Sequence, residues 1–254
     1  MKSRSALRLL LDGDLDKAIE THSARRINKI VELRSGITRY LEIGVQEGLT
    51  LQGVKLPIRC AVDPFPQFNT TRLPSGISFH RQKSDDFFSE LRANEAFDVI
   101  FLDGLHEWFQ TYKDTVNALN FLSPGGVIII DDVVPCDSVS AMPSLKDSYR
   151  TRAENGSPER RWHGDVYKVL FALRDWHPNV TFQVIVNGID NPQAVVWIAD
   201  STASQVFNLV AKENDYDHLG FEEAFPQNEP PDFFLVDDED SIIQRACRTK
   251  PKEA

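Results

Sequence analysis

The chain has 254 residues, of which 41% are hydrophobic, and a formal net charge of −10 at pH 7. This size suffices for one large α/β domain with appendages, and the acidic balance disfavours nucleic acid and anionic membranes as partners. Three widely spaced cysteines without a CxxC pair argue against a zinc site or a disulfide framework. Because no run approaches the ~20 apolar residues of a membrane span, we expect a cytoplasmic protein without membrane partners.

The first part of the chain is expected to be a helix followed by a strand and a glycine turn. Apolar residues recur at broadly helical spacing from Asp14 to Arg34, so residues 1–37 are predicted to form a helical cap. The run from Thr38 to Ile43 then reads as the first strand. Gly44 and Gly48 follow it, where glycines let the backbone approach a ligand and helix amides favour an anionic group. Both glycines are equally explained as tight-turn residues.

Two further strands are expected at Ile58 to Val62 and at Ile77 to His80. The first ends at Asp63, about twenty residues beyond the glycine turn, where doubly wound folds place an acidic side chain against ribose hydroxyls. A turn residue would explain Asp63 equally well. The second strand leads into Ser84 and Asp85, which fit either hydrogen bonds to a nucleobase or the cap of a short helix.

The segment from Phe97 to Pro135 is predicted to be a parallel strand, helix and strand. The short β-branched run from Asp98 to Leu102 fits a strand buried on both faces. Apolar residues at helical spacing follow from Trp108 to Leu122, and a Ser-Pro-Gly-Gly break ends the helix. The run from Val127 to Ile130 is the second buried strand. A connection of this length is typical of a parallel βαβ unit.

Three carboxylates follow the ends of these two strands, namely Asp103, Asp131 and Asp132. Parallel strands bring them to the carboxyl edge of the sheet, where open α/β sheets bind ligands. Gathered oxyanions repel one another unless a cation compensates their charge. Ligation by oxygen alone favours Mg²⁺, with Mn²⁺ or Ca²⁺ as alternatives, over Zn²⁺. Taken singly, each aspartate is also explained as a helix cap or a turn residue.

The remainder of the chain is predicted to hold a long loop, a helix and two strands before an extension. Residues 136–162 are irregular and lie next to Asp132, which favours a lid or acceptor-binding loop. An amphipathic helix is expected from Gly164 to His177, followed by an antiparallel strand pair. Residues 201–254 form an acidic C-terminal extension. Its section from 212 to 240 holds eleven carboxylates against one lysine, which favours a solvated appendage over an interaction tail.

The order of these motifs resembles that of class I S-adenosylmethionine-dependent methyltransferases, in the catechol and macrocin O-methyltransferase-like branch. The motifs that carry the resemblance are LEIGVQEGLT after Tyr40, Asp63 after the second strand, LDGLH after the fourth, IIIDD after the fifth, and WHGDVYKVLFALR from Trp162 to Arg174. The resemblance covers about residues 38–200, the methyltransferase domain. It implies an α/β fold with a doubly wound, mostly parallel seven-stranded sheet and an antiparallel edge strand.

The resemblance also implies roles for individual residues. For the cofactor, it places Gly44 and Gly48 beside the methionine portion and Glu42 and Thr50 near the amino and carboxylate groups. It places Asp63 at the ribose, and Ser84 and Asp85 at the adenine. For a divalent metal ion, it implies the ligands Asp103, Asp131 and Asp132. His106 lies three residues after Asp103, where catechol-type enzymes carry a lysine as general base. An imidazole with a pKa of about 6.5 suits proton transfer near neutrality, so His106 and Asp103 are the catalytic candidates.

The function expected from these features is metal-assisted O-methylation of a small-molecule hydroxyl, with S-adenosyl-L-methionine as the methyl donor. A metal favours acceptors with two neighbouring oxygens, such as a sugar diol or a catechol. A metal-independent methyltransferase acting on another acceptor and a non-catalytic cofactor-binding scaffold stay open as alternatives, as does homo-oligomer formation. A dinucleotide oxidoreductase is disfavoured because the tighter G-x-G-x-x-G spacing is absent.

Overall fold

A seven-stranded sheet runs through the part of the chain that this computed structural model describes, residues 20–186, 192–199 and 206–248. Its strands are β1 (Arg39–Ile43), β2 (Ile58–Val62), β3 (Ile77–His80), β4 (Phe97–Leu102), β5 (Leu122–Ile130), β6 (Val180–Ile185) and β7 (Gln193–Ile198). Their order is β3-β2-β1-β4-β5-β7-β6, with β7 antiparallel to both of its neighbours and the pairs among β1 to β5 parallel. The predicted doubly wound, mostly parallel seven-stranded sheet with an antiparallel strand pair at one edge is thereby confirmed.

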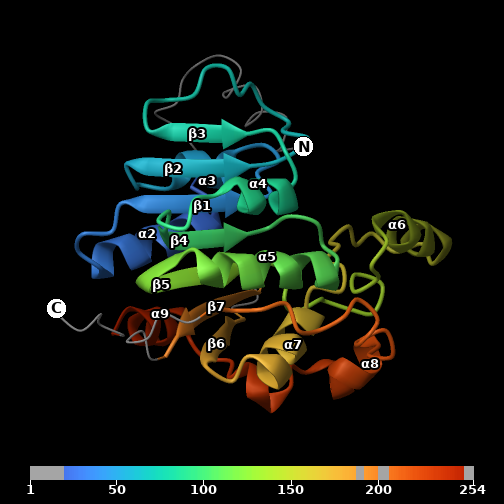
Figure 1. The fold of residues 1–254 in the computed structure, drawn as a ribbon. Coiled ribbons are helices and arrows are strands. Elements are labelled where there is room, and N and C mark those ends of the chain that lie inside the picture. The colour runs from blue at the N-terminus through green and yellow to red at the C-terminus, as the bar shows by residue number, and fades with distance from the viewer. Residues whose placement is uncertain (1–19, 187–191, 200–205, 249–254) are drawn as a thin grey trace.

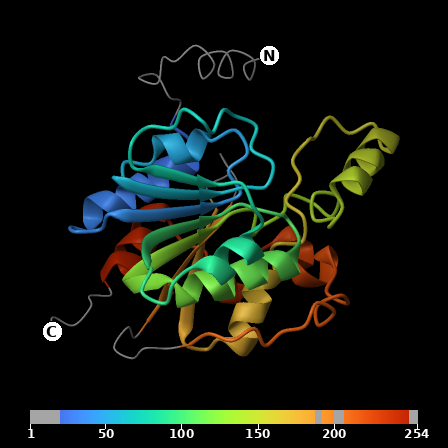
Figure 2. The same ribbon diagram turned by 45° about the horizontal axis from the view of Figure 1, so that its top comes forward.

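Helices cover both faces of the sheet, as Figures 1 and 2 show. One face carries α2 (His22–Leu33), α3 (Leu49–Gly53) and α9 (Glu239–Arg248), and the other carries α4 (Ser84–Glu90), α5 (Trp108–Asn120) and α7 (Lys168–Trp176). The central strands are apolar on both faces because both are buried: Val99 and Ile129 pack towards α2 and α3, whereas Ile100 and Ile128 pack towards α5 and α7.

The chain reverses its winding direction between β1 and β4. Strands β2 and β3 lie on one side of β1, and β4 and β5 lie on the other. The carboxyl edge at this switch point is where doubly wound sheets bind ligands. Helix α6 (Leu145–Glu154) lies at this edge and stands away from the rest of the molecule (Figure 1).

Several predicted boundaries are corrected by the structure. The stretch 136–162 is not irregular throughout, because α6 lies inside it and is capped by the Ser144 hydroxyl. Helix α7 begins at Lys168 and not at Gly164, since residues 164–167 form turns that start from a left-handed Gly164 with φ +63°. The first part of the predicted N-terminal helix and the turn between β6 and β7 lie outside the described residues.

The acidic C-terminal segment packs against the body of the protein. Phe221, Phe225 and Phe234 are buried in the same core as α7. Helix α9 lies beside α2, where Glu239 forms an ion pair of 2.8 Å with the buried Arg26. The boundaries predicted at residues 37 and 200 stay predictions. Within the described ranges, none of the helices is both long and apolar enough to span a bilayer.

Candidate functional site

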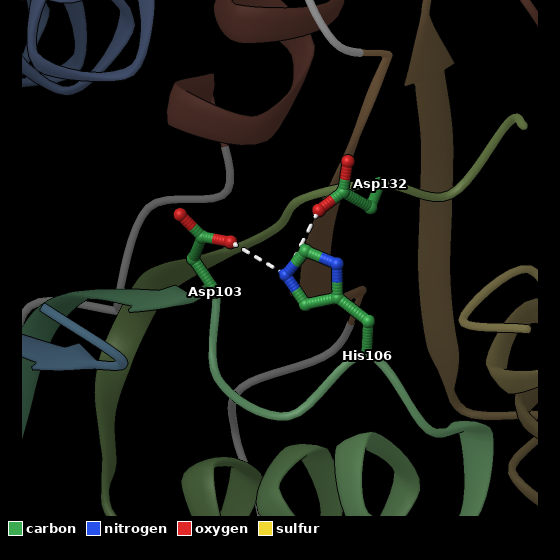
Figure 3. A group of neighbouring side chains, drawn as sticks. All are labelled: Asp103, His106 and Asp132. Atoms are coloured by element: carbon green, nitrogen blue, oxygen red, sulfur yellow. Dashed lines mark ion pairs between the residues drawn. The ribbon is translucent and has the colours of Figure 1, made fainter. Parts of the chain in front are cut away.

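Three polar side chains meet at the carboxyl edge of the sheet, from the ends of β4 and β5 and from the loop before α5 (Figure 3). The Nε2 atom of His106 lies 3.4 Å from Oδ1 of Asp103 and 3.2 Å from Oδ2 of Asp132. The side chain of Asp132 is only 2% exposed, whereas that of Asp103 is 36% exposed. The cluster is therefore buried on the β5 side and open on the β4 side, so that a ligand can approach it.

Burial and the neighbouring charges together shift the pKa values of Asp132 and His106. Burial raises the pKa of Asp132 to about 7; the positive charge of His106 lowers it and the negative charge of Asp103 raises it further. Burial alone would lower the pKa of His106, but its hydrogen bond with Asp103 and the charges of both carboxylates raise it to about 9. The positive charge of His106 and the negative charges of the two carboxylates therefore favour each other.

The donor set of the cluster fits a divalent ion. One ligand atom from each of Asp103, His106 and Asp132 can be chosen so that all three lie within 4.8 Å of one another, which allows them to converge on one ion. The two carboxylates suit Mg²⁺, Mn²⁺ or Ca²⁺, whereas an imidazole is a more usual ligand of ions such as Zn²⁺ or Fe²⁺. Metal binding at such sites displaces protons from the ligands.

Asp131 is not part of this group of possible ligands among the described residues. Its Oδ1 accepts a hydrogen bond of 2.9 Å from the backbone N–H of Asp132, and its carboxyl group also bonds the side chain of Gln193. Burial and the neighbouring carboxylates of Asp132 and Asp103 hold the pKa of Asp131 well above its usual range. Of the three predicted metal ligands, the structure therefore brings together Asp103 and Asp132, and it places the predicted base His106 between them.

The glycine turn after β1 packs closely against neighbouring loops. A Cβ atom on Gly44 would lie 1.9 Å from the backbone oxygen of Asp103, and one on Gly48 would touch the ring of Phe68. Asp63 ties this turn to β2, because its Oδ2 accepts hydrogen bonds from the backbone N–H groups of Val45 and Gln46 at 2.9 and 2.8 Å. Its Oδ1 accepts a third, from the residue two positions on. The predicted ribose ligand thus also organises the turn.

Glu42 lies beneath this turn, 1% exposed, and accepts a hydrogen bond of 2.7 Å from the hydroxyl of Tyr40. Burial raises the pKa of Glu42 to about 8, despite the Tyr40 hydrogen bond, which lowers it; the charge of Asp103 adds to the rise. Thr50 bonds the hydroxyl of Thr21, the N-cap of α2, at 2.9 Å. Of the two residues predicted near the amino and carboxylate groups of the cofactor, Glu42 therefore lies on β1 and Thr50 lies in the first turn of α3.

The raised pKa of Glu42 predicts a stability that falls with pH. Between the ordinary value of 4.5 and about 8, the folded state holds a proton that the unfolded state has lost, so wild type loses stability as pH rises. Glu42→Gln removes this term, which is worth ~1.4 kcal/mol per pH unit over the interval. Urea unfolding of both proteins at several pH values measures it. Parallel stability curves for the two proteins would contradict the prediction.

Ser84 and Asp85 join α4 to α5. The side-chain amide of Gln110 donates hydrogen bonds to Ser84 Oγ at 3.3 Å and to Oδ1 of Asp85 and Asp114 at 3.0 and 3.1 Å. Lys113 forms an ion pair of 2.8 Å with Asp85. Sequence reasoning missed Gln110 and Asp114, which is 3% exposed and has a pKa that burial raises to about 6. The sequence feature that could have revealed them is the occurrence of polar residues on the inward-facing side of a predicted helix.

One cation and two histidines of the segment from Trp162 to His177 have defined partners. Lys168 is buried and forms an ion pair of 3.0 Å with Asp165. His177 shares a hydrogen bond of 2.8 Å with the Tyr112 hydroxyl, consistent with a structural role. His163 is buried with its Nε2 atom 3.9 Å from Oδ1 of Asp132, so it lies directly behind the cluster.

Comparison with known proteins finds a match to a family model in one part of the chain. Residues 41–133 match a family model described as Methyltransferase domain. The match covers just over a third of the chain and includes every residue predicted to contact cofactor or metal. No curated protein matches the chain.

Solved structures similar to this chain include methyltransferases of two kinds. The O-methyltransferase from Bacillus cereus in complex with SAH is 16% identical with a TM-score of 0.48, covering 77% of this chain and 89% of that one. TomG from Streptomyces achromogenes, an O-methyltransferase of tomaymycin synthesis, is 13% identical with a TM-score of 0.46, covering 77% and 88%. The N-methyltransferase NodS from Bradyrhizobium japonicum WM9 is 17% identical with a TM-score of 0.40, covering 73% and 96%. At these identities the likeness concerns the fold alone.

Proposed function

We propose that this protein is an S-adenosylmethionine-dependent O-methyltransferase that acts on a small-molecule hydroxyl with the assistance of a divalent ion. The observation that carries the proposal is the meeting of Asp103, His106 and Asp132 at the carboxyl edge, next to the glycine turn of the matched methyltransferase domain. A base between two carboxylates suits an acceptor that must lose a proton as it is methylated.

The cofactor is proposed to lie across the glycine turn and the loops after β2 and β3. Glu42 and Thr50 would meet its amino and carboxylate groups, and Ser84 and Asp85 would meet the adenine. Asp63 already accepts three backbone N–H groups, and a carboxylate offers about four lone-pair sites. One site is left for a ribose hydroxyl, so Asp63 would both fix the turn and bind the ribose.

In the proposed reaction the acceptor oxygen attacks the methyl carbon of the sulfonium group. The oxygen–carbon bond forms as the sulfur–carbon bond breaks, S-adenosylhomocysteine leaves, and His106 takes the hydroxyl proton. Asp103 and Asp132 would hold the ion, Mg²⁺ or alternatively Mn²⁺ or Ca²⁺, and the ion would supply positive charge that lowers the pKa of an acceptor hydroxyl and orients it. A cation there would also offset the charges that raise the pKa of His106, favouring the neutral imidazole that a base requires.

The acceptor is proposed to carry two neighbouring oxygens, as a sugar diol or a catechol does, because two oxygens can share one ion. Two alternatives keep the same fold: a metal-independent methyltransferase for another acceptor, and a non-catalytic cofactor-binding scaffold. The first predicts full turnover in the presence of a chelator. The second predicts cofactor binding without labelled product from any acceptor.

Calorimetry with S-adenosylhomocysteine, with and without Mg²⁺, followed by an acceptor screen with labelled cofactor, tests the proposal. We expect binding in both conditions, methyl transfer to a diol or catechol, and loss of transfer in EDTA. His106→Ala should lower turnover by about 10²- to 10⁴-fold, the range of general-base contributions, and leave S-adenosylhomocysteine affinity unchanged. The matched control is His218→Ala, which removes an exposed imidazole away from the site. Unchanged turnover in His106→Ala would exclude its role as base.

A further inference from the structure

The segment from Trp162 to Asp165 lies against His106, although more than fifty residues of chain separate them. The indole of Trp162 stacks on the imidazole of His106, with ring centroids 4.8 Å apart and ring planes 14° from parallel. The indole is itself anchored, because its Nε1–H donates a hydrogen bond of 2.7 Å to the carbonyl oxygen of Met142. One face of the His106 ring is therefore covered by a ring whose own position is set.

The backbone of the next two residues, His163 and Gly164, is fixed against the loop that contains Ser140 and Met142. The N–H groups of His163 and Gly164 both donate to the carbonyl oxygen of Ser140, at 2.9 and 3.0 Å. Gly164 has φ +63°, and a Cβ atom there would lie 1.8 Å from the carbonyl oxygen of His106. The close contact between these two backbones hence requires glycine.

Asp165 completes the contact at the start of α5. Its Oδ1 accepts a hydrogen bond of 2.8 Å from the backbone N–H of Trp108, the first residue of the helix, while its Oδ2 pairs with Lys168. The N-cap residue Glu107 supplies no side-chain cap of its own. The helix start two residues after His106 is thus capped from the distant segment.

The imidazole of His106 needs such support. Its Nε2 atom faces the two carboxylates, and its buried Nδ1 atom has no hydrogen bond of good geometry among the described residues, although the backbone of Trp162 lies close enough to help raise the pKa of His106. Because a poorly paired buried nitrogen costs free energy, the ring gains from a contact that keeps it in place. Stacking on an anchored indole opposes rotation of the ring, since aromatic pairs gain energy only in a narrow range of geometries.

We propose that Trp162 is a positioning residue that holds the imidazole of His106 between Asp103 and Asp132. The inference rests on the proposed function for its catalytic consequence, but its structural part can be measured without any acceptor. Trp162 lies outside residues 41–133, so neither the family match nor the carboxylate motifs assign it a role.

The test compares Trp162→Ala, Trp162→Phe and, as a matched control, Trp176→Ala, which removes an indole that is 45% exposed on α7. The ring protons of His106, identified by their loss in His106→Gln, are observed by NMR. A proton stacked on an indole is shifted upfield, so Trp162→Ala should move the His106 signal towards that of the exposed His218. Trp162→Phe should keep part of the upfield shift, and Trp176→Ala should keep all of it.

Turnover gives the second measurement, once the acceptor screen supplies a substrate. Trp162→Ala should lower kcat about tenfold, the factor that corresponds to ~1.4 kcal/mol, with S-adenosylhomocysteine affinity unchanged, and Trp162→Phe should restore most of it. A His106 signal that does not move in Trp162→Ala overturns the inference, as does a signal that moves while kcat stays at the wild-type value. Absence of turnover in wild type would instead overturn the proposed function, and the NMR comparison would still decide whether Trp162 holds the ring.

Discussion

Replacing Asp132 by Asn is expected to weaken divalent-ion binding by more than about 100-fold, beyond the ~10- to 100-fold typical for loss of an outer partner of a ligand. Asp132 lies within the cluster, its Oδ2 3.2 Å from His106, and its side chain is 2% exposed. The amide keeps the shape but removes the negative charge that would attract the ion. Titration with Mn²⁺, followed by electron paramagnetic resonance, measures the affinity directly, and methyl transfer should be lost in parallel.

Asp131→Asn is the matched control, because the same change is made one residue away. The Asp131 carboxyl group bonds the Asp132 backbone and Gln193, and an amide oxygen can still accept from the Asp132 N–H. Burial and the neighbouring carboxylates raise the pKa of Asp131 and so disfavour its charged form, and the amide that replaces it is uncharged. Mn²⁺ affinity should therefore stay within about threefold of wild type, a change of less than 1 kcal/mol. Equal losses in both variants would show that Asp131 is a ligand after all.

The difference between Asp131 and Asp132 is a feature of the site that could not be predicted from the sequence. The buried runs of β4 and β5 and their parallel connection could be predicted, and with them the edge at which the carboxylates lie. Consecutive residues of an extended strand point to opposite sides, but Asp132 has φ +62°, a left-handed conformation that a run of two aspartates does not reveal. Which carboxylate faces the site was therefore decided by backbone geometry that local sequence does not show.

Long-range contacts account for the other differences. The periodicity from Gly164 onward predicted one amphipathic helix, yet Asp165 reaches back to cap α5 and buries Lys168 with it. Spacing within a segment reports which residues share a face, whereas it contains no information on a partner more than fifty residues away. The same limit hid the stacking of Trp162 on His106, although the residues were singled out as parts of separate motifs.

Gly44→Ala is expected to destabilise the fold by about 4 kcal/mol or more, in the range of the largest single-substitution effects. Gly44 has φ +82°, which costs a residue with a Cβ atom roughly 1–2 kcal/mol. In addition, the new Cβ would lie 1.9 Å from the backbone oxygen of Asp103 and 2.5 Å from the Cα of Gly104. Neither backbone atom can rotate away, because Asp103 is held by a hydrogen bond of 2.9 Å to the carbonyl of Ile43. Urea unfolding measures the loss.

Gly36→Ala separates the two contributions. Gly36 has nearly the same backbone angle, φ +83°, but a Cβ atom there would meet nothing within 4 Å. Gly36→Ala should therefore lower the free energy of unfolding only by the cost of the left-handed backbone, roughly 1–2 kcal/mol. The additional loss in Gly44→Ala then measures the contact between the turn after β1 and the loop after β4. Because that contact joins the proposed cofactor turn to the loop that carries Asp103, Gly44→Ala should also abolish binding of S-adenosylhomocysteine under conditions in which the variant is folded. Similar stability losses in the two variants, with cofactor binding intact in both, would mean that the two loops are not coupled through Gly44.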